Sequence, residues 1–271
     1  MSQVSIIMPA YNAVQFIGSA VESVLAQEWQ DWELLVVDDG STDSTWEALA
    51  EYEDSRILKF RQNNSGVSAA RNRALREMNG DFFCFLDADD LLPAGSIASR
   101  MELFNDDEDL LFVDGSVQVR DLSMSCILEE RQHTFSGNPF RALLQIDNSC
   151  FFGPTWMIRR IPGKEYGFKV GLTHGEDLLF YMDLSREGGQ YSATSDITYL
   201  YRTGNTSAMS DLNGLWKGYR SILSEITTWP EVDSKDRQTF SRKISAIMIK
   251  SYLASYRPLS ALKVILDYFR L

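Results

Sequence analysis

Short apolar runs alternate with helical patterns in the first part of the chain. The runs lie at residues 4–8, 34–37, 57–60, 82–86 and 110–113. After the first run, apolar side chains spaced at i, i+3 and i+4 predict an amphipathic helix over residues 17–25. Continuously apolar runs are typical of strands buried on both faces. Their alternation with helices predicts an α/β fold in which a mostly parallel central sheet is flanked by helices.

Two more helices are expected in this region. Cap-forming residues at 41–44 predict the first of them. The second should run from about residue 68 to residue 78 and end at Asn79-Gly80 in a left-handed turn. Ligands of parallel sheets bind beyond the carboxyl ends of the strands, so the residues that follow each strand are the place to look for function.

The pattern loosens after residue 116. Helices are expected at 140–146 and 178–184, and the stretch 212–271 is predicted to be helical nearly throughout. No linker composition separates this C-terminal region as an independent domain. With 271 residues, the chain is long enough for one large α/β domain, alone or with a smaller appendage.

Composition narrows the class of partner. The formal net charge of −12 argues against nucleic acid, because binding a polyanion needs a lysine and arginine surface. Three widely spaced cysteines fit no metal-ligand pattern and indicate reduced thiols in a cytoplasmic protein. The run at 4–8 is too short for a signal peptide, and no stretch approaches the roughly 18 apolar residues of a membrane span. We therefore expect a chain that does not cross a membrane.

Four strand ends carry residues suited to binding a charged ligand. They are Pro9-Ala10-Tyr11-Asn12, Asp38-Asp39-Gly40-Ser41, the segment 63–68 leading to Arg71, and Asp87-Ala88-Asp89-Asp90. Because the carboxyl ends of parallel strands meet at one edge of a sheet, we expect these segments to converge.

The carboxylates of Asp87, Asp89 and Asp90 stand close together in the sequence. Like charges about 4 Å apart repel by roughly 1 kcal/mol in water and up to about 4 kcal/mol in a semi-buried site. A divalent cation reverses this penalty, and oxygen ligands suit Mg²⁺ or Mn²⁺ carrying substrate phosphates. The alternative is a solvated acidic turn that caps a following helix started by Pro93. The position directly after an apolar strand favours the metal site.

The other strand ends admit both a binding and a structural interpretation. A carboxylate of Asp38 or Asp39 can accept a hydrogen bond from a pyrimidine base or a ribose hydroxyl, but Asp-Gly is also ordinary turn chemistry. The ring of Tyr11 is suited to stack on the base, or to lie half-buried at a helix start. Arg71 is suited to meet a diphosphate, although a surface salt bridge is the commoner fate of an arginine.

An acidic pair, Glu176-Asp177, opens the helix expected at 178–184. The helix dipole favours carboxylates at a helix amino terminus, so the pair is either structural or supplies a general base for an acceptor hydroxyl. Neither His133 nor His174 has a partner at zinc-site spacing, and for His174 a structural role is favoured over one in an acceptor pocket. No G-x-G-x-x-G, P-loop or G-x-S-x-G pattern occurs.

In their order and spacing, the four strand ends resemble those of the family 2 glycosyltransferases of the GT-A fold. The resemblance is dense over residues 4–113 and thin afterwards, apart from Gly175-Glu176-Asp177. It implies a GT-A type fold with a helical C-terminal region. The implied divisions are a donor-binding half at 1–115, an acceptor-binding and catalytic half at 116–210, and a helical extension at 211–271.

The resemblance also implies roles for single residues. The residues implied to bind the nucleotide sugar are Pro9, Ala10, Tyr11, Asn12, Asp38, Asp39, Arg71, Asp87 and Ala88. Among these, Pro9 and Tyr11 would border the base, and Asp38 or Asp39 would contact uracil and ribose. Asp89 would bind the metal, Mn²⁺ or Mg²⁺. Asp177 falls at the position of the catalytic base, with Glu176 beside it.

The implied activity is transfer of a sugar, with inversion, from a nucleotide diphosphate donor, a UDP-sugar, to a hydroxyl of a saccharide or lipid-linked saccharide. Such an enzyme would serve bacterial surface polysaccharide synthesis in the cytoplasm, at the inner face of the membrane. One alternative is a sugar nucleotidyltransferase, whose glycine-rich, arginine-containing loop after the first strand is unlike residues 9–12. The other is a non-catalytic nucleotide-sugar binding protein.

The last residues, 261–271, combine an apolar helical pattern with Lys263 and Arg270. This pattern suits contact with a membrane surface, where lipid-linked acceptors reside. It equally suits a helix that packs on the catalytic domain or across a homodimer, which is the favoured interpretation.

Overall fold

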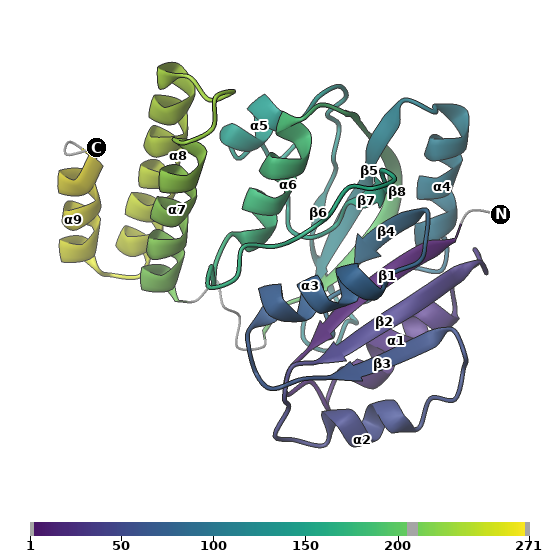
Figure 1. The fold of residues 1–271 in the computed structure, drawn as a ribbon. Helices are drawn as coiled ribbons and strands as arrows, with labels where there is room; N and C mark the ends of the chain where they lie inside the picture. Colours follow the sequence, from purple (N-terminus) through teal and green to yellow (C-terminus); the bar gives the residue numbers. More distant parts are fainter. Residues whose placement is uncertain (1–2, 205–210, 269–271) are drawn as a thin grey trace.

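The computed structural model describes residues 3–204 and 211–268, and a central sheet forms its core (Figure 1). The strands are β1 (Val4–Ala10), β2 (Trp32–Asp38), β3 (Ile57–Arg61), β4 (Phe82–Phe85), β5 (Leu110–Arg120), β6 (Ile127–Arg131), β7 (Met157–Arg159) and β8 (Gln190–Arg202). The helices are α1 (Ile17–Leu25), α2 (Thr45–Ala50), α3 (Val67–Glu77), α4 (Ser96–Asp106), α5 (Phe140–Leu144), α6 (Glu176–Arg186), α7 (Leu212–Ile226), α8 (Ser234–Ala254) and α9 (Pro258–Tyr268). The end of the predicted acceptor half, 205–210, and the predicted helical residues 269–271, Arg270 among them, lie outside the described residues.

The sheet is mostly parallel, as predicted. Strands β3, β2, β1 and β4 lie side by side and parallel in that order. The short strand β7 then runs antiparallel between β4 and β5. β5 pairs along one edge with β8, parallel, and along the other with β7 and then β6, both antiparallel. The insertion of β7 was not predicted, because three residues are too few to carry a strand pattern.

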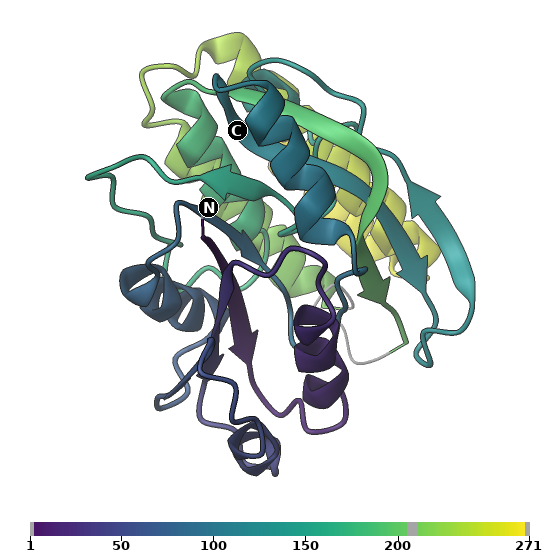
Figure 2. The ribbon, with the colours of Figure 1, turned by 90° about the vertical axis from the view of Figure 1, so that its right-hand side faces the viewer.

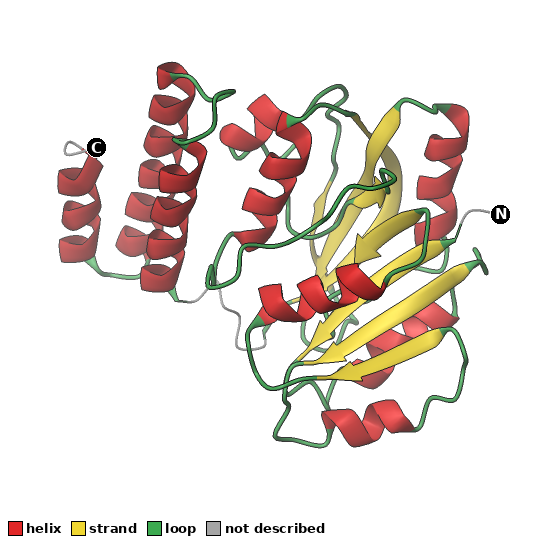
Figure 3. Cartoon of the chain, in the orientation of Figure 1, coloured by secondary structure: helices red, strands yellow, loops and turns green. Residues whose placement is uncertain are grey.

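Helices cover both faces of the sheet (Figures 1 and 3). Every residue of β1 and β2 is buried, and successive side chains point to opposite faces. Ile7 and Leu35 join the apolar layer that includes residues of α3, α5 and α6. Ile6 and Leu34 join the layer that includes residues of α1 and α4. The continuous apolar runs of the sequence are therefore explained by burial on two faces, and Figure 2 shows the second view of this arrangement.

β5 is longer than the predicted run at 110–113, because a polar segment continues the strand in the interior. Asp114 is fully buried, and its carboxylate lies 2.7 Å from Nδ1 of His133 and accepts a hydrogen bond from the hydroxyl of Thr155 at 2.9 Å. Burial lowers the pKa of the His133 imidazole, but the charge of Asp114 acts in the opposite direction, and the net result is that the pKa is raised. The boundary predicted at 115/116 falls inside this strand, and the division by role stays a prediction.

The predicted left-handed end of α3 is wrong. The helix ends at Glu77, and Met78 turns into extended backbone with φ −67° and ψ 141°. Among the described residues of positive φ, neither Asn79 nor Gly80 appears. Both donate their backbone N–H to the carboxylate of Glu33, at 2.6 and 3.3 Å. Gly80 is required by close approach instead, since a Cβ there would lie 2.7 Å from the carbonyl oxygen of residue 3.

Three helices, α7, α8 and α9, form the C-terminal region, which confirms the helical prediction for its described part. Asp211 caps α7, and Asp233 and Asp236 form a reciprocal capping box at the start of α8. The hydrophobic core continues from the sheet through α6 into these helices. Within the described ranges, none of the helices combines the length and apolar character needed to span a bilayer.

Two glycines bring α7 against the segment that leads into α6. A Cβ on Gly214 would lie 2.4 Å from the ring of His174, and one on Gly218 would lie 2.4 Å from the carbonyl oxygen of His174. His174 is buried beneath the helix, and its ring lies 3.0 Å from the hydroxyl of Thr173. This packing agrees with the structural role favoured for His174.

We predict that Gly218→Ala destabilises the protein, although alanine is the better helix former. The added methyl group meets backbone rather than a flexible side chain, and overpacking of this kind costs about 1–3 kcal/mol. The measurement is the midpoint of urea unfolding. Gly95→Ala is the matched control, because the new Cβ would meet nothing closer than 3.9 Å. Equal midpoints for the two variants would contradict the close approach of α7.

Candidate active site

The predicted strand ends meet at one edge of the sheet. The turn after β1 is tied to the turn after β2, because Oδ1 of Asn12 accepts from the backbone N–H of Thr42 at 2.8 Å. The hydroxyl of Ser41 also accepts a hydrogen bond from the backbone N–H of Asn12 at 2.9 Å. The turn after β2 is in turn tied to the loop after β3, since Asp39 accepts from the N–H of Gly66 at 2.8 Å. Convergence of these loops is therefore confirmed.

The carboxylates of Asp38 and Asp39 are both buried and both engaged by the protein. Asp38 lies 3.0 Å from Nε of Arg61, and Asp39 accepts from the side-chain amide of Gln62 at 2.8 Å. Gly40, in the turn after β2, has φ 74°. A Cβ there would lie 2.7 Å from the backbone nitrogen of Asn64, in the loop after β3. The two aspartates thus shape the wall of the site, and their contacts with base and ribose stay predictions.

The turn after β1 presents one large side chain to solvent. Pro9 and Ala10 are the last residues of β1 and are buried, whereas the ring of Tyr11 is 51% exposed. An aromatic ring with this exposure is open to stacking on a planar ligand. The predicted role of Tyr11 at the nucleobase is compatible with this position and stays a prediction.

The acidic loop after β4 is fastened to β8. The buried carboxyl of Asp90 accepts from the hydroxyl of Tyr199 at 2.8 Å and from the N–H of Arg202 at 2.7 Å. Nε of Arg202 donates to the carbonyl of Asp89 at 2.6 Å, and the N–H of Asp87 donates to the hydroxyl of Tyr199 at 3.2 Å. Burial, followed by the charges of Asp89 and Asp87, raises the pKa of Asp90 well above its ordinary value. Asp90 therefore anchors the loop.

This loop does not cap the next helix. α4 begins at Ser96, beyond Pro93, and no side chain caps its amino terminus. Among the described residues, no group of three or more His, Cys, Asp and Glu side chains is arranged to hold a metal. Mg²⁺ and Mn²⁺ bound with substrate phosphates need only one or two protein carboxylates. The half-buried carboxylate of Asp89, with donor phosphate oxygens, fits that requirement.

A buried arginine joins the acidic loop to the start of α6. The two terminal nitrogens of Arg71 lie 2.8 Å from Asp87 and 3.0 Å from Glu176. The guanidinium is also close to the rings of Phe85 and Phe168, at 5.8 and 5.2 Å. Burial lowers the pKa of Arg71, but the two carboxylates outweigh it and raise that pKa above its ordinary value. Arg71 is therefore a charged cross-link rather than a surface salt bridge.

Asp177 has a different environment from its neighbour Glu176. Its carboxylate accepts from the N–H of Leu178 at 2.7 Å, and a Cβ on Gly153 would lie 3.9 Å from its other oxygen. Burial, then the charge of Glu176, raises the pKa of Asp177 from 3.8 to about 7, although Arg71 acts in the opposite direction. A carboxyl group with this pKa can exchange a proton near neutral pH, as a general base must.

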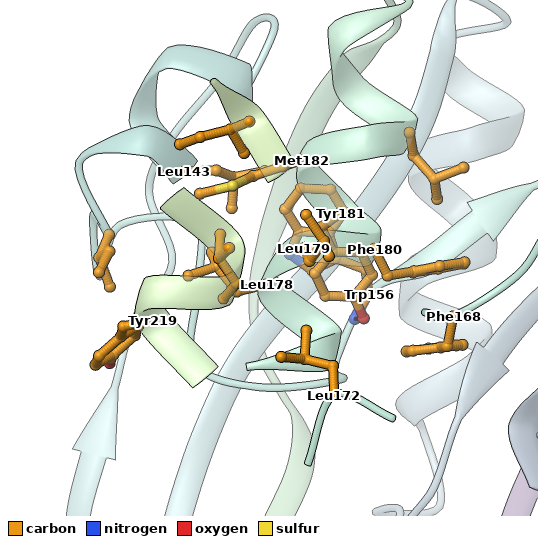
Figure 4. Close-up of a cluster of buried hydrophobic side chains, with 14 of the residues drawn as sticks. Leu143, Trp156, Phe168, Leu172, Leu178, Leu179, Phe180, Tyr181, Met182 and Tyr219 are labelled. Atoms are coloured by element: carbon orange, nitrogen blue, oxygen red, sulfur yellow. Dashed lines mark hydrogen bonds between the residues drawn. The ribbon is translucent and has the colours of Figure 1, made fainter. Parts of the chain in front are cut away.

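Aromatic packing fixes the helix that carries this acidic pair. Figure 4 shows Leu178, Leu179, Phe180, Tyr181 and Met182 of α6 within a cluster of buried side chains. The ring of Phe180 stacks on Phe168 at 4.2 Å, and that of Tyr181 stacks on Trp156 at 4.2 Å. Gly175, with φ 74°, turns the chain into the helix. The turn that carries Glu176 and Asp177 is thereby held against the sheet.

The structure brings most of the sequence-predicted residues to this edge of the sheet. Asp87, Ala88 and Asp89 lie on one loop, and Arg71 places Glu176 beside it. Two residues that hold the loop, Tyr199 and Arg202, were not predicted. Their only signal is an alternation of large side chains in β8, which is ordinary for a strand.

The fold and this arrangement are compatible with a transferase that uses a nucleotide sugar, and comparison with known proteins shows the family. Residues 5–167 match the family model described as "Glycosyl transferase family 2". The chain therefore belongs to glycosyl transferase family 2, and its fold is of the GT-A type.

Curated relatives cover different shares of the chain. An uncharacterised glycosyltransferase of Rickettsia felis is 28% identical over 248 residues, which are 91% of this chain and 40% of the relative. The chain thus spans less than half the length of that relative. The Escherichia coli protein WfgD, a UDP-Glc:alpha-D-GlcNAc-diphosphoundecaprenol beta-1,3-glucosyltransferase, is 46% identical over 101 residues, 37% of this chain and 38% of WfgD.

Solved structures share the fold. S. aureus TarS 1-349, in complex with UDP-GlcNAc, has a TM-score of 0.75 and 18% identity, covering 99% of this chain and 80% of TarS. The mannosyltransferase PcManGT of Pyrobaculum calidifontis, in complex with GDP-Man and Mn²⁺, has a TM-score of 0.63 and 18% identity, covering 98% and 74%. At this level of identity, these structures establish the fold.

We predict that Arg71→Ala destabilises the protein by about 3–5 kcal/mol, because it leaves two carboxylates in a buried site without their cation. Thermal unfolding measures the loss. The matched control is Arg76→Ala in the same helix, where the side chain is exposed and the change should stay within about 0.5 kcal/mol. Similar melting temperatures for the two variants would show that Arg71 is not a cross-link.

Proposed function

We propose that the chain is an inverting glycosyltransferase, which moves a sugar from a nucleotide diphosphate donor to a hydroxyl of an acceptor. The observation that carries this proposal is the position of Asp177, beside Glu176 in the turn that Arg71 ties to the acidic loop. Burial, which raises the pKa of its carboxyl group to about 7, supports the assignment. A base held next to a donor-binding loop suits deprotonation of a hydroxyl that attacks the donor sugar.

In the proposed reaction, Asp177 accepts the proton of the acceptor hydroxyl. The oxygen of that hydroxyl attacks the anomeric carbon on the face opposite the diphosphate. A new carbon–oxygen bond forms while the bond to the diphosphate oxygen breaks, and the electron pair of the broken bond leaves with the diphosphate. A single displacement of this kind inverts the anomeric configuration. Glu176 remains paired with Arg71, so Asp177 is the member of the pair that takes the proton.

The leaving diphosphate needs positive charge. Mg²⁺ or Mn²⁺, held by Asp89 and by donor oxygens, would supply it, and the Mn²⁺ in the PcManGT complex supports this choice. Arg71 was predicted to meet the diphosphate, and that contact stays a prediction. With both terminal nitrogens on carboxylates, its guanidinium is better placed to position Asp87 and Glu176.

The names of relatives support a narrower proposal for the substrates. We propose a UDP-sugar donor, in line with WfgD and with the UDP-GlcNAc complex of TarS. We propose a saccharide or lipid-linked saccharide acceptor in bacterial surface polysaccharide synthesis, at the inner face of the membrane, because WfgD acts on a diphosphoundecaprenol-linked sugar. No specific observation favours a non-catalytic binding protein or a nucleotidyltransferase.

We predict that Asp177→Asn keeps donor binding and lowers turnover by about a hundredfold or more, the contribution typical of a general base. Donor affinity is measured by calorimetry, and turnover by release of the nucleoside diphosphate in the presence of acceptor. Turnover near the wild-type value would make the assignment of the base wrong. Tight donor binding by the wild-type chain without turnover on any acceptor would instead support the non-catalytic alternative.

The pH dependence follows from the same carboxyl group. Below a pKa of about 7 Asp177 is protonated and cannot accept a proton, so kcat/KM should fall about tenfold per pH unit on the acid side. The residual activity of Asp177→Asn should lack this acid limb. An identical limb in the variant would assign it to another group.

We predict that Asp89→Ala abolishes transfer and removes metal-dependent nucleotide binding. The variant should show no rise in melting temperature when Mn²⁺ and the nucleotide are added together, whereas the wild-type chain should be stabilised by mass action. Asp109→Ala is the control, because Asp109 is an exposed carboxylate outside this loop. Equal stabilisation of Asp89→Ala and wild type would refute the metal assignment.

A further inference from the structure

A cationic groove lies between α7 and α9, away from the residues of the candidate active site. Its cavity has a volume of about 340 Å³. Lys217 and Arg220 of α7 and Lys263 of α9 line it, together with the hydroxyls of Ser221 and Ser224. These cations stand out in a chain whose formal net charge is −12. The groove is therefore a local basic surface on an acidic protein.

A second observation concerns the wall of this groove. Trp216 lines it and is buried, and the indole N–H of Trp216 has no hydrogen-bond acceptor among the described residues. One terminal nitrogen of Arg220 lies 3.5 Å from the carboxylate of Asp267. Hydrogen-bond donors therefore predominate in this part of the surface.

An apolar face adjoins the groove. On one side of α9, Ala261 and Val264 are buried, and α9 packs along α8. On the opposite side Leu259, Leu262 and Leu266 are 81%, 50% and 51% exposed, at a spacing that places them on one stripe. Lys263 belongs to the same helix and lines the groove. One face of this helix therefore packs on the preceding helix, and the opposite face is exposed.

Exposed apolar side chains are concentrated here. The ring of Tyr256, in the turn between α8 and α9, is 94% exposed and is held at φ 55°, which is uncommon for a residue other than glycine. Figure 1 shows α9 as the outermost helix of the C-terminal region. A basic groove beside an apolar helix face is the combination by which proteins bind the surface of an anionic membrane.

We propose that the α7–α9 groove and the open face of α9 form a docking surface for an anionic membrane. The phosphates of lipid head groups enter the groove, and the stripe of Leu259, Leu262 and Leu266 lies in the boundary between head groups and acyl chains. Charge complementarity favours this occupant, because Lys217, Arg220 and Lys263 gather positive charge in one groove and anionic head groups carry the opposite charge.

The docking surface lies one helix away from the proposed base. Gly214 and Gly218 of α7 contact His174, three residues before Asp177, while Lys217 and Arg220 of the same helix line the groove. A helix with side chains is about 10–12 Å across. The inference rests on the proposed function in one respect: a lipid-linked acceptor held at this surface would have its saccharide within reach of Asp177.

The test is co-sedimentation of the full chain with vesicles, without donor or acceptor. We expect binding to vesicles that contain about one-third phosphatidylglycerol and little binding to phosphatidylcholine alone, with loss at high salt. Lys217→Glu and Lys263→Glu should each weaken binding at least about fivefold, since a lysine near the surface contributes about 1 kcal/mol. Lys235→Glu, the same charge change in the exposed first turn of α8, should alter it less than about twofold.

Three results would overturn the proposal. The first is equal binding to both kinds of vesicle, and the second is equal binding of Lys217→Glu and Lys235→Glu. The third is a dimer in sedimentation equilibrium that Leu262→Ser dissociates, because the stripe would then be an interface between two copies. Turnover with a detergent-solubilised acceptor should be the same in these variants and wild type. If the wild-type chain turns over an acceptor but does not bind the anionic vesicles, the docking surface is wrong and the proposed function stands. If it binds the vesicles as expected but turns over no acceptor, the proposed function is wrong and the docking surface stands.

Discussion

The guanidinium of Arg71 lies between Asp87, at the end of β4, and Glu176, at the start of α6. The side chains of Arg71, Glu176 and Asp87 are 3%, 13% and 32% exposed. Removing the guanidinium of Arg71 from water is expensive, and only close pairing with hydrogen bonds offsets that penalty. The arrangement is stable only while all three groups are present. Since Asp87 belongs to the acidic loop after β4 and Glu176 to the turn that carries the proposed base, one buried cation joins the two parts of the site.

The rest of the site follows from this constraint. Burial and the charge of Glu176 raise the pKa of the Asp177 carboxyl to about 7, although the nearby Arg71 lowers it. The acidic loop is held from the other side, because the carboxyl of Asp90 accepts from Tyr199 and Arg202 and the carbonyl of Asp89 accepts from Arg202. Aromatic stacking behind α6 limits movement of the turn. A pre-organised site of this kind is what electrostatic catalysis requires.

Much of the donor side could be predicted from the sequence. Parallel strands buried on two faces produce continuous apolar runs, and the loops that follow such strands must meet at one edge. Each group of residues at that edge, from Asn12 to Asp89, therefore directly follows a strand that the sequence reveals. Their motifs also carry the family resemblance, which the match over residues 5–167 confirms.

The remaining features depend on tertiary contacts that leave no local pattern. β7 is too short to be seen, and Asp114 extends β5 only because His133 and Thr155 satisfy it in the interior. Tyr199 and Arg202 reach the acidic loop over more than 100 residues of chain, at separations of 109 and 112 from Asp90. The predicted donor contact of Arg71 stays a prediction, and its two carboxylate partners come from distant elements that no local pattern links.

The central claim is that Arg71 couples the acidic loop after β4 to the turn that begins α6. A double-mutant cycle on the free energy of unfolding, with Asp87→Asn, Glu176→Gln and the double variant, tests it most directly. Each single variant leaves Arg71 one carboxylate, but the double variant leaves a buried cation with none, so the double should lose about 0.5–3 kcal/mol more than the sum of the singles. Additive losses would contradict the coupling.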